Sequence, residues 1–394
     1  MKKLWVLLAC VSFSYGQSLE SLLLKLKSQN LTLQQAQDAI MIEDENHNLA
    51  GTWENPTLGI GANDLLIDDI TARDREPMQT HFVTFSQKIP LGGKVDLKRD
   101  VALREVEIAK SSYHDRGLRL ASLLRRYAYK VAIIEKKLNL ITRYQQNVKK
   151  LKRLHTKLFE VGKSPQSLIE DTKILAKRLL IKKRKLVTMK GIFLHKIEAL
   201  VYEDVPSVEV ALEMDKNLSI NLQKHPIMIG ETLKVEKSQE ALKLAKASKI
   251  PDVKLGLGYF QREDRSDYLA INAGIELPIR GRENSKIQIA SLKLAQAKKH
   301  RASRLFALEK EIEVLEASMQ DAKKNFHILM REIVPKKRYI GKLLAQELFT
   351  KNSSTTTLVS NLNARIVLEL DAYDEMDSYF SAYAKLVYFE GGLS

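Results

Sequence analysis

The residues best suited to chemistry are the eight histidines, because a neutral imidazole serves both as a metal ligand and as a proton carrier. They are scattered along the chain, and no two of them stand three or four residues apart, the spacing that places two ligands on one helix face. Met78 and His81 stand close together in a polar segment, which leaves one alternative open. The spacing of the histidines predicts no metal site formed within one chain.

Short glycine motifs do not complete any cofactor fingerprint. LGGK at 91–94 lacks the remaining spacing of a phosphate-binding loop. GIG at 59–61 and GLG at 256–258 are interpreted as small residues of strands and not as dinucleotide-binding motifs. No motif brings a nucleophile, a base and an orienting group together. The sequence therefore predicts neither a cofactor nor an enzyme.

The first 16 residues have the layout of a secretory signal peptide. Two lysines precede an apolar run that ends near Tyr15, and the small residues Ser14 and Gly16 follow the pattern of a cleavage site. The alternative is a lipid anchor on Cys10, the only cysteine. Cleavage after Gly16 would leave a chain without disulfides. No later stretch reaches the ~20 apolar residues of a membrane-spanning helix.

The formal net charge of +16 raises the possibility of nucleic-acid binding. The basic clusters at 149–157, 177–185 and 298–304 fall within helical periodicity, and few aromatic residues stand among them. A solvated helix face is the expected interpretation for an exported chain, and no nucleic-acid partner is predicted.

Two stretches alternate apolar residues at spacings of three and four, the pattern of helices packed by coiled-coil rules. The first series is Gly117, Leu120, Leu124, Tyr127, Val131, Ile134, Leu138 and Ile141. A second series from Leu305 to Ile333 repeats these positions 188 residues later. The turns LFEVGKSPQSL at 158–168 and LFTKNSSTTTL at 348–358 repeat at an offset of 190. The sequence predicts an internal two-fold repeat, with one helix from about 93 to 158 that would be ~100 Å long.

Four segments of about ten residues alternate with period two, at 55–66, 81–90, 251–260 and 269–278. One face is apolar; the other is small or polar and comprises Gly59, Gly61, Asn63, Thr84, Ser86, Gly256, Gly258, Asn272 and Gly274. The aromatic residues expected to form a girdle near the strand ends are Trp53, Phe82, Tyr259, Phe260 and Tyr268. Each strand is long enough to cross a bilayer when tilted. The alternative is a soluble sandwich with one solvated face.

Four strands cannot close into a barrel, and lipid tolerates only a sheet without free edges. Two chains would supply eight strands and a barrel filled by its own side chains. Three chains would supply twelve strands and leave space for a lumen.

With its paired hairpins, its heptad helices, its Leu-Phe turns and the stretches NPTLGIGAND and FSQKIPLGGK, the chain resembles the TolC-type outer-membrane efflux proteins, most closely their heavy-metal (CzcC/CusC-like) branch. The resemblance implies a mainly α fold with a small β part. Long antiparallel coiled-coil helices would form an α-barrel, and four strands per chain would contribute to a trimeric 12-stranded β-barrel.

The resemblance also implies an order of segments along the chain. These are a signal peptide at 1–16, an N-terminal periplasmic helical segment at 17–54, an outer-membrane hairpin at 55–90, a long helical hairpin at 91–204 with its tip at 158–168, a linker and entry helix at 205–250, a second outer-membrane hairpin at 251–278, and a second long helical hairpin with the C-terminal helix at 279–394 and its tip at 348–358.

By the same resemblance, the two tips would contact a periplasmic adaptor protein. The tip residues are Leu158, Phe159, Val161, Gly162, Leu348, Phe349 and Asn352. Where that family has two inward aspartates that narrow the periplasmic mouth, this chain has Ser360 and Asn363. A charged constriction would then come from Glu170, Asp171 and Lys173 after the first tip; without trimer symmetry, these are ordinary exposed helix residues.

The function implied is a passive exit duct of a tripartite efflux system in the outer membrane of a Gram-negative bacterium, with a long periplasmic part. Its partners would be two further copies of the chain in a homotrimer, the adaptor, an inner-membrane RND-type pump and outer-membrane lipid. The expected cargo is metal cations. Multidrug efflux, type I secretion and a soluble periplasmic coiled-coil scaffold are the alternatives.

Overall fold

The structure is a computed structural model that describes residues 16–163, 165–215, 217–350 and 355–391, without the side chains of 347–350, 355 and 356. The described chain is mainly helical with a small β part, which confirms the predicted fold class at that level. It divides into two compact units, each assembled from separate stretches. Unit 1 comprises 1–34, 115–225 and 307–394, and unit 2 comprises 35–114 and 226–306.

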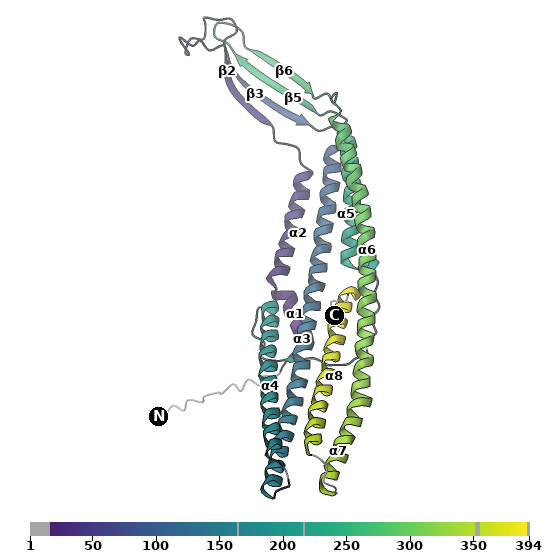
Figure 1. The fold of residues 1–394 in the computed structure, drawn as a ribbon. Coiled ribbons are helices and arrows are strands. Elements are labelled where there is room, and N and C mark those ends of the chain that lie inside the picture. The colour runs from purple at the N-terminus through teal and green to yellow at the C-terminus, as the bar shows by residue number, and fades with distance from the viewer. Residues whose placement is uncertain (1–15, 164, 216, 351–354, 392–394) are drawn as a thin grey trace, which may run out of the picture. The chain divides into compact units, whose positions relative to one another are not determined.

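Unit 1 is helical (Figure 1). Its elements are β1 (Gln17–Ser18), α1 (Leu19–Gln29), most of α3 (Lys94–Glu160), α4 (Gln166–Val201), β4 (Val208–Glu209), the short helix η1 (Leu222–Lys224), the last part of α6 (Arg282–His327), the π-helical turn η2 (Ile328–Ile333), α7 (Val334–Thr350) and α8 (Thr355–Glu390). The long helix predicted from about 93 to 158 is α3.

The heptad residues of α3 make it the centre of unit 1. Leu124, Val131 and Ile141 are fully buried. One apolar cluster joins α3 to α1 and α4, a second joins it to α6 and α8, and a third joins it to α4 and α8. Burial of about 1.5–3 kcal/mol per large apolar side chain accounts for the stability of helices whose exposed faces are strongly charged.

The π-helical turn η2 interrupts the helical path immediately before Pro335. Proline has no N–H to donate to the preceding turn, and its ring crowds the carbonyl four residues back. One wider turn accommodates both effects, so the helix continues as α7 instead of ending. The apolar spacing did not predict this irregularity.

Unit 2 contains a four-stranded antiparallel sheet in the order β2-β3-β5-β6 (Figure 1). The strands are β2 (Thr57–Asn63), β3 (Thr80–Ile89), β5 (Val253–Gln261) and β6 (Tyr268–Ile275), and they fall within or overlap the four predicted segments. The unit also holds most of α2 (Leu31–Ala50), the start of α3, α5 (Pro226–Ala247) and most of α6.

The junction between β3 and α3 explains the residues LGGK. Gly92 and Gly93 have φ of +74° and +67°, a left-handed backbone that glycine adopts without steric cost. Lys94 Nζ lies 2.6 Å from Asp252 Oδ1, and the Leu91 N–H donates to the same carboxylate. This turn therefore links the end of one hairpin to the start of the other.

In the described part of the chain, no helix is both long enough and apolar enough to cross a membrane.

Candidate functional site: the two-faced sheet and the helical turns

The strand register sorts the side chains of the sheet onto two faces, because residues paired across strands point the same way. The paired rows of one face include Leu58, Phe85, Leu257 and Ile271, and Ile60, Val83, Tyr259 and Leu269. These side chains are exposed, with Ile60 at 78% and Ile271 at 82%. A continuous apolar surface of this kind marks a contact with lipid or with another protein.

The opposite face carries small and polar residues, as the sequence predicted. Its paired rows include Gly59, Thr84, Gly258 and Ala270, and Thr57, Ser86, Gly256 and Asn272. This face can therefore contact water while the other face contacts an apolar phase.

The register corrects the predicted aromatic girdle. Phe82 pairs with Phe260, which pairs with Tyr268, so all three rings belong to the small and polar face. Their ring centroids lie 5.5 and 4.8 Å apart. Phe82 and Phe260 lie against glycines of the sheet, where an added Cβ would come within 2.5–2.6 Å of the rings. Phe82 and Phe260 each stand next to a residue of the apolar face in the sequence. Because side chains alternate between the two faces along a strand, both rings lie on the small and polar face.

Both edges of the sheet lack a partner within the described residues. β2 pairs only with β3, and β6 pairs only with β5. Each outer edge therefore presents a row of backbone N–H and C=O groups that need hydrogen-bond partners. In lipid such an edge would cost several kcal/mol per unpaired group.

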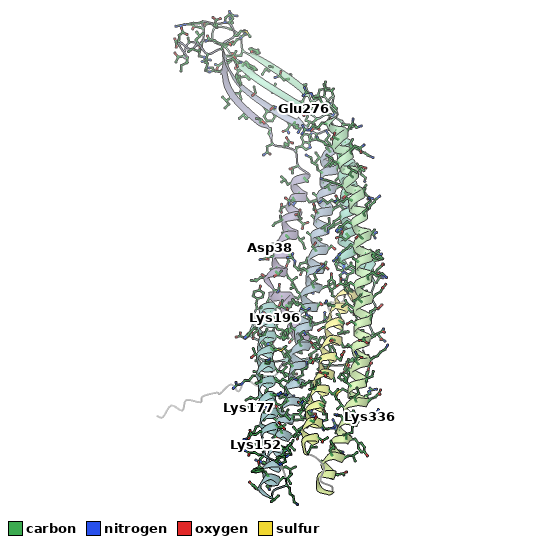
Figure 2. All side chains as sticks on the ribbon, in the orientation of Figure 1. Asp38, Lys152, Lys177, Lys196, Glu276 and Lys336 are labelled. Carbon is green, nitrogen blue, oxygen red and sulfur yellow. The ribbon has the colours of Figure 1, made fainter. Side chains whose placement is uncertain are left out.

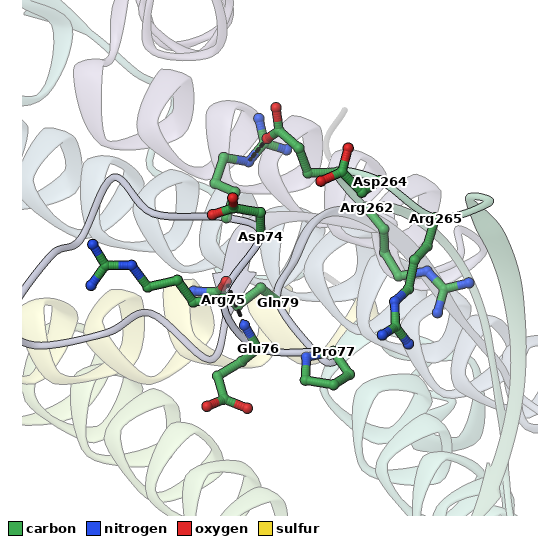
Figure 3. A pocket seen from close by; sticks show the side chains of 10 residues that line it. Asp74, Arg75, Glu76, Pro77, Gln79, Arg262, Asp264 and Arg265 are labelled. Carbon is green, nitrogen blue, oxygen red and sulfur yellow. Dashed lines mark hydrogen bonds and ion pairs between the residues drawn. The ribbon is translucent and has the colours of Figure 1, made fainter.

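The loops that follow β2 and β5 form a charged pocket at one end of the sheet (Figure 3). Arg73 pairs with Glu263 across the two loops at 3.3 Å. Gln79 is buried and donates to the carbonyl oxygens of Asp64 and Ala72, which holds the first loop in shape. Both loops are polar and suited to an aqueous surface.

The turn between α3 and α4 contains four of the predicted tip residues and has a complete helix C-cap. Gly162 has a φ of +69° and donates to the Phe159 carbonyl at 2.9 Å, while the Lys163 N–H donates to the Leu158 carbonyl at 2.8 Å. This pair of hydrogen bonds is the Schellman motif, which satisfies the last carbonyls of a helix. Phe159 and Val161 are exposed and Leu158 is half-buried, so the turn presents an apolar tip.

The second predicted tip is described only in part. Leu348 and Phe349 belong to α7, but their side chains fall outside the described residues, as does Asn352 altogether. Only the first tip is therefore described with its side chains up to Lys163.

The structure places the predicted constriction residues on exposed helix surface. Glu170 Oε1 and Lys173 Nζ form an ion pair at 2.6 Å within α4, and Asp171 is exposed beside it. Ser360 and Asn363 are exposed on α8. Within one chain, the carboxylate of Glu170 is therefore partly neutralised by its neighbour.

A buried polar network between α3 and α8 was missed by the sequence reasoning. Tyr144 donates to Glu369 at 2.8 Å, and Arg365 donates to the Tyr144 hydroxyl at 2.6 Å. Burial raises the pKa of Tyr144 to about 12. The partners stand 225 positions apart along the chain, so no local motif could have revealed them.

His155 was missed as well. Its side chain is fully buried on α3, and neither ring nitrogen has a hydrogen-bond partner within the described residues. Burial lowers the pKa of His155, because an imidazolium there would lose its hydration. The described residues contain no group of three or more histidine, cysteine or acidic side chains that could hold a metal ion.

Comparison with known proteins supports the architecture. No protein-family model and no curated protein matches the chain. Among solved structures, CusC, studied for transmembrane channel formation, matches this chain with a TM-score of 0.82 at 12% identity. The alignment covers 95% of this chain and 92% of the CusC chain. The CmeC outer-membrane channel of Campylobacter jejuni matches with a TM-score of 0.78 at 13% identity, and the alignment covers 95% of this chain and 86% of the CmeC chain.

The outer-membrane protein VceC of Vibrio cholerae also matches with a TM-score of 0.78, at 15% identity, and the alignment covers 95% of this chain and 96% of the VceC chain. At these identities the likeness establishes the fold, which is that of outer-membrane channel proteins.

Proposed function

We propose that the chain is a passive exit duct in the outer membrane of a Gram-negative bacterium, assembled as a homotrimer. The observation that carries the proposal is the sheet with one exposed apolar face, one small and polar face, and two edges without partners among the described residues. An isolated copy would leave both edges unpaired in lipid, whereas three copies would pair every edge in a closed barrel of twelve strands. The apolar face would contact lipid and the polar face would line the lumen.

The helices would continue the duct into the periplasm. The predicted tips are proposed to contact a periplasmic adaptor, which in turn binds an inner-membrane RND-type pump. The exposed apolar turn at Phe159 and Val161 supports such a contact. Glu170, Asp171, Lys173, Ser360 and Asn363 are proposed to surround the periplasmic mouth.

Metal cations are proposed as the cargo, and drugs or other small molecules are the alternative. The resemblance to the heavy-metal branch favours the first, while the fold does not distinguish the two, since CusC, CmeC and VceC share it at similar TM-scores. Deletion of the gene, followed by tolerance tests with copper, zinc, cadmium, nickel and a panel of dyes, separates the two. Selective loss of metal tolerance supports cation efflux, and selective loss of dye tolerance supports the alternative.

Reconstitution into a planar bilayer tests the duct directly, and two neighbouring residues on β6 give a matched pair of variants. Ile271→Arg places a charge on the apolar face and is expected to cost about 2–4 kcal/mol in lipid, so that membrane incorporation falls. Asn272→Arg places the same charge on the polar face and is expected to preserve incorporation while changing ion selectivity.

The opposite pattern, or no conductance from folded wild-type trimers, contradicts the proposal. Recovery of the wild-type protein as a water-soluble monomer without detergent favours the rival, a soluble periplasmic scaffold.

A further inference from the structure

The end of the α3–α4 hairpin carries a large surplus of positive charge. Residues 149–185 contain 13 lysines and arginines and three acidic residues. The segment that stands 190 positions later, 339–375, contains three basic and five acidic residues. The surplus therefore belongs to the first hairpin alone and does not follow from the helical pattern that both segments share.

The fold leaves this charge almost uncompensated. Among the described residues, Lys173 is the only one of the 13 with an ion pair, to Glu170. Twelve of the 13 side chains are exposed and Lys183 is half-buried. Figure 2 labels Lys152 on α3 and Lys177 on α4, both near the turn that joins the two helices. Uncompensated like charges at this density repel one another and destabilise the bare hairpin.

The basic residues occupy several sides of the hairpin outside the stripe of α4 that packs against α8. Lys182, Lys183, Arg184 and Lys185 are consecutive, and successive residues of a helix point about 100° apart. An amphipathic surface that lies on a membrane keeps its cations on one side. The distribution therefore suits a partner that contacts more than one exposed side of the hairpin better than it suits a planar lipid surface.

The corresponding segment of a second copy of this chain, 339–375, cannot supply the missing negative charge. The segment 339–375 has a surplus of only two acidic residues, so complete pairing with it would still leave the first hairpin with a surplus of eight positive charges. A partner of another kind must be acidic over an extended surface.

We propose that the end of the α3–α4 hairpin, residues 149–185, is the docking surface for an acidic protein partner that covers the faces of the hairpin not packed against α8. The inference rests on the proposed function, in which the adaptor is that partner, and it adds the chemistry of recognition. Binding would be driven by charge complementarity along both helices, with the apolar tip as the end of the interface. The α7–α8 end would bind the same partner more weakly.

The test measures binding of a fluorescent 20-residue polyglutamate peptide to the full-length detergent-solubilised protein by anisotropy, between ~50 and ~300 mM NaCl. The affinity of the wild type is expected to fall steeply with salt. Six Lys→Gln substitutions in the hairpin are expected to weaken binding at least about tenfold at low salt. They are K149Q, K152Q, K157Q, K177Q, K182Q and K185Q.

A matched control removes six exposed lysines outside the hairpin end and so gives the same net charge. The control positions are Lys98, Lys286, Lys293, Lys298, Lys299 and Lys324. The control is expected to change affinity by no more than about twofold, and circular dichroism confirms the fold of both variants. Equal losses in the two variants would overturn the proposal, because binding would then follow net charge alone.

Binding of phosphatidylglycerol vesicles and of duplex DNA to the same proteins tests the two alternative partners, lipid and nucleic acid. If either binds the wild type tightly, and the hairpin substitutions abolish that binding but not peptide binding, the surface recognises lipid or nucleic acid and the proposal is wrong. Bilayer conductance of the hairpin variant separates this result from the duct. Normal conductance with unchanged peptide affinity refutes only the docking surface, whereas absent conductance in the wild type refutes the duct.

Discussion

The two helical hairpins of unit 1 share an apolar pattern and differ in charge. In both, the apolar residues at spacings of three and four are buried or half-buried, apart from the exposed Ile333, and both hairpins contribute to clusters around α3. Their ends differ, because 149–185 carries ten more basic than acidic residues while 339–375 carries two more acidic than basic residues. Packing depends on the buried stripe, so the exposed residues can differ without changing the fold.

The comparison separates the buried residues that stabilise the hairpins from the surface residues that are available to partners. Substitutions in the buried stripe should cost similar amounts in either hairpin. Substitutions on the surface should cost little in either, while they change recognition in the first hairpin alone. Four predictions test this division, in order of decreasing effect.

The largest effect is expected from the shared core. Phe380 is fully buried on α8, with its ring centroid 4.4 Å from that of Tyr129. Phe380→Ala should lower the free energy of unfolding by about 3–5 kcal/mol, and Leu124→Ala on α3 by about 2–5 kcal/mol. Thermal unfolding of the detergent-solubilised protein measures both. The control is Phe159→Ala at the exposed tip, with an expected effect within about 0.5 kcal/mol. A core substitution with an effect as small as that of the control would contradict the role of the buried stripe in stability.

A smaller effect is expected from the polar network that joins the hairpins. Glu369→Gln replaces the charged acceptor of Tyr144 and should cost about 1.5–3 kcal/mol, since Glu369 is buried. The matched change Glu170→Gln removes an exposed i,i+3 pair and should cost no more than about 0.5 kcal/mol. Urea unfolding followed by circular dichroism measures the difference. Equal costs would mean that burial does not distinguish the two carboxylates.

A substitution in the turn of the first hairpin is expected to change stability only through the backbone conformation of that turn. Gly162 has positive φ, and no atom lies within 4 Å of the position that an added methyl group would take, so Gly162→Ala should cost about 1 kcal/mol through strain only. Gly191 lies inside α4 with equally free space, and Gly191→Ala should stabilise by up to about 1 kcal/mol. The two unfolding midpoints should shift in opposite directions; a shift in the same direction would contradict the assigned role of the turn.

The smallest effect is a pH dependence at the same hairpin end. Burial lowers the pKa of His155, so the folded state keeps it neutral while the unfolded chain binds a proton near pH 6.5. Below that pH the unfolded state binds more protons, and the free energy of unfolding falls as the pH is lowered. Burial also lowers the pKa of His225, which adds to the trend.

Unfolding midpoints at pH 7.5 and 5.5 measure this dependence, with His155→Leu as the comparison. The variant should lose less stability on acidification than the wild type, because the contribution of His155 is removed. An equal loss in both proteins would show that His155 is not protonated on unfolding.

The elements of this chain were largely predictable because they follow simple periods. The three-four spacing predicted α3 close to its observed bounds, and period two predicted four strands and their two faces. The aromatic residues were misplaced because closeness to a strand end was weighed above parity. Phe82 and Phe260 each stand one position away from an apolar residue, which turns them to the polar face.

The candidate site was predictable only in its local parts. The Leu-Phe turn with Gly162 could be found because a C-cap depends on neighbouring residues. The network of Tyr144, Arg365 and Glu369 could not be found, because its members meet only after α8 packs on α3. The burial of His155 depends likewise on tertiary packing.

By itself, the sequence determined the helices, the strands, the faces of the sheet and the charge difference between the hairpins, since each depends on residue type and spacing along one element. Only the tertiary structure decided which polar groups meet, which edges lack partners and which cations lack counter-charges among the described residues. These are properties of distance in space, and a linear pattern of residues does not specify distances between elements that pack only in the folded chain.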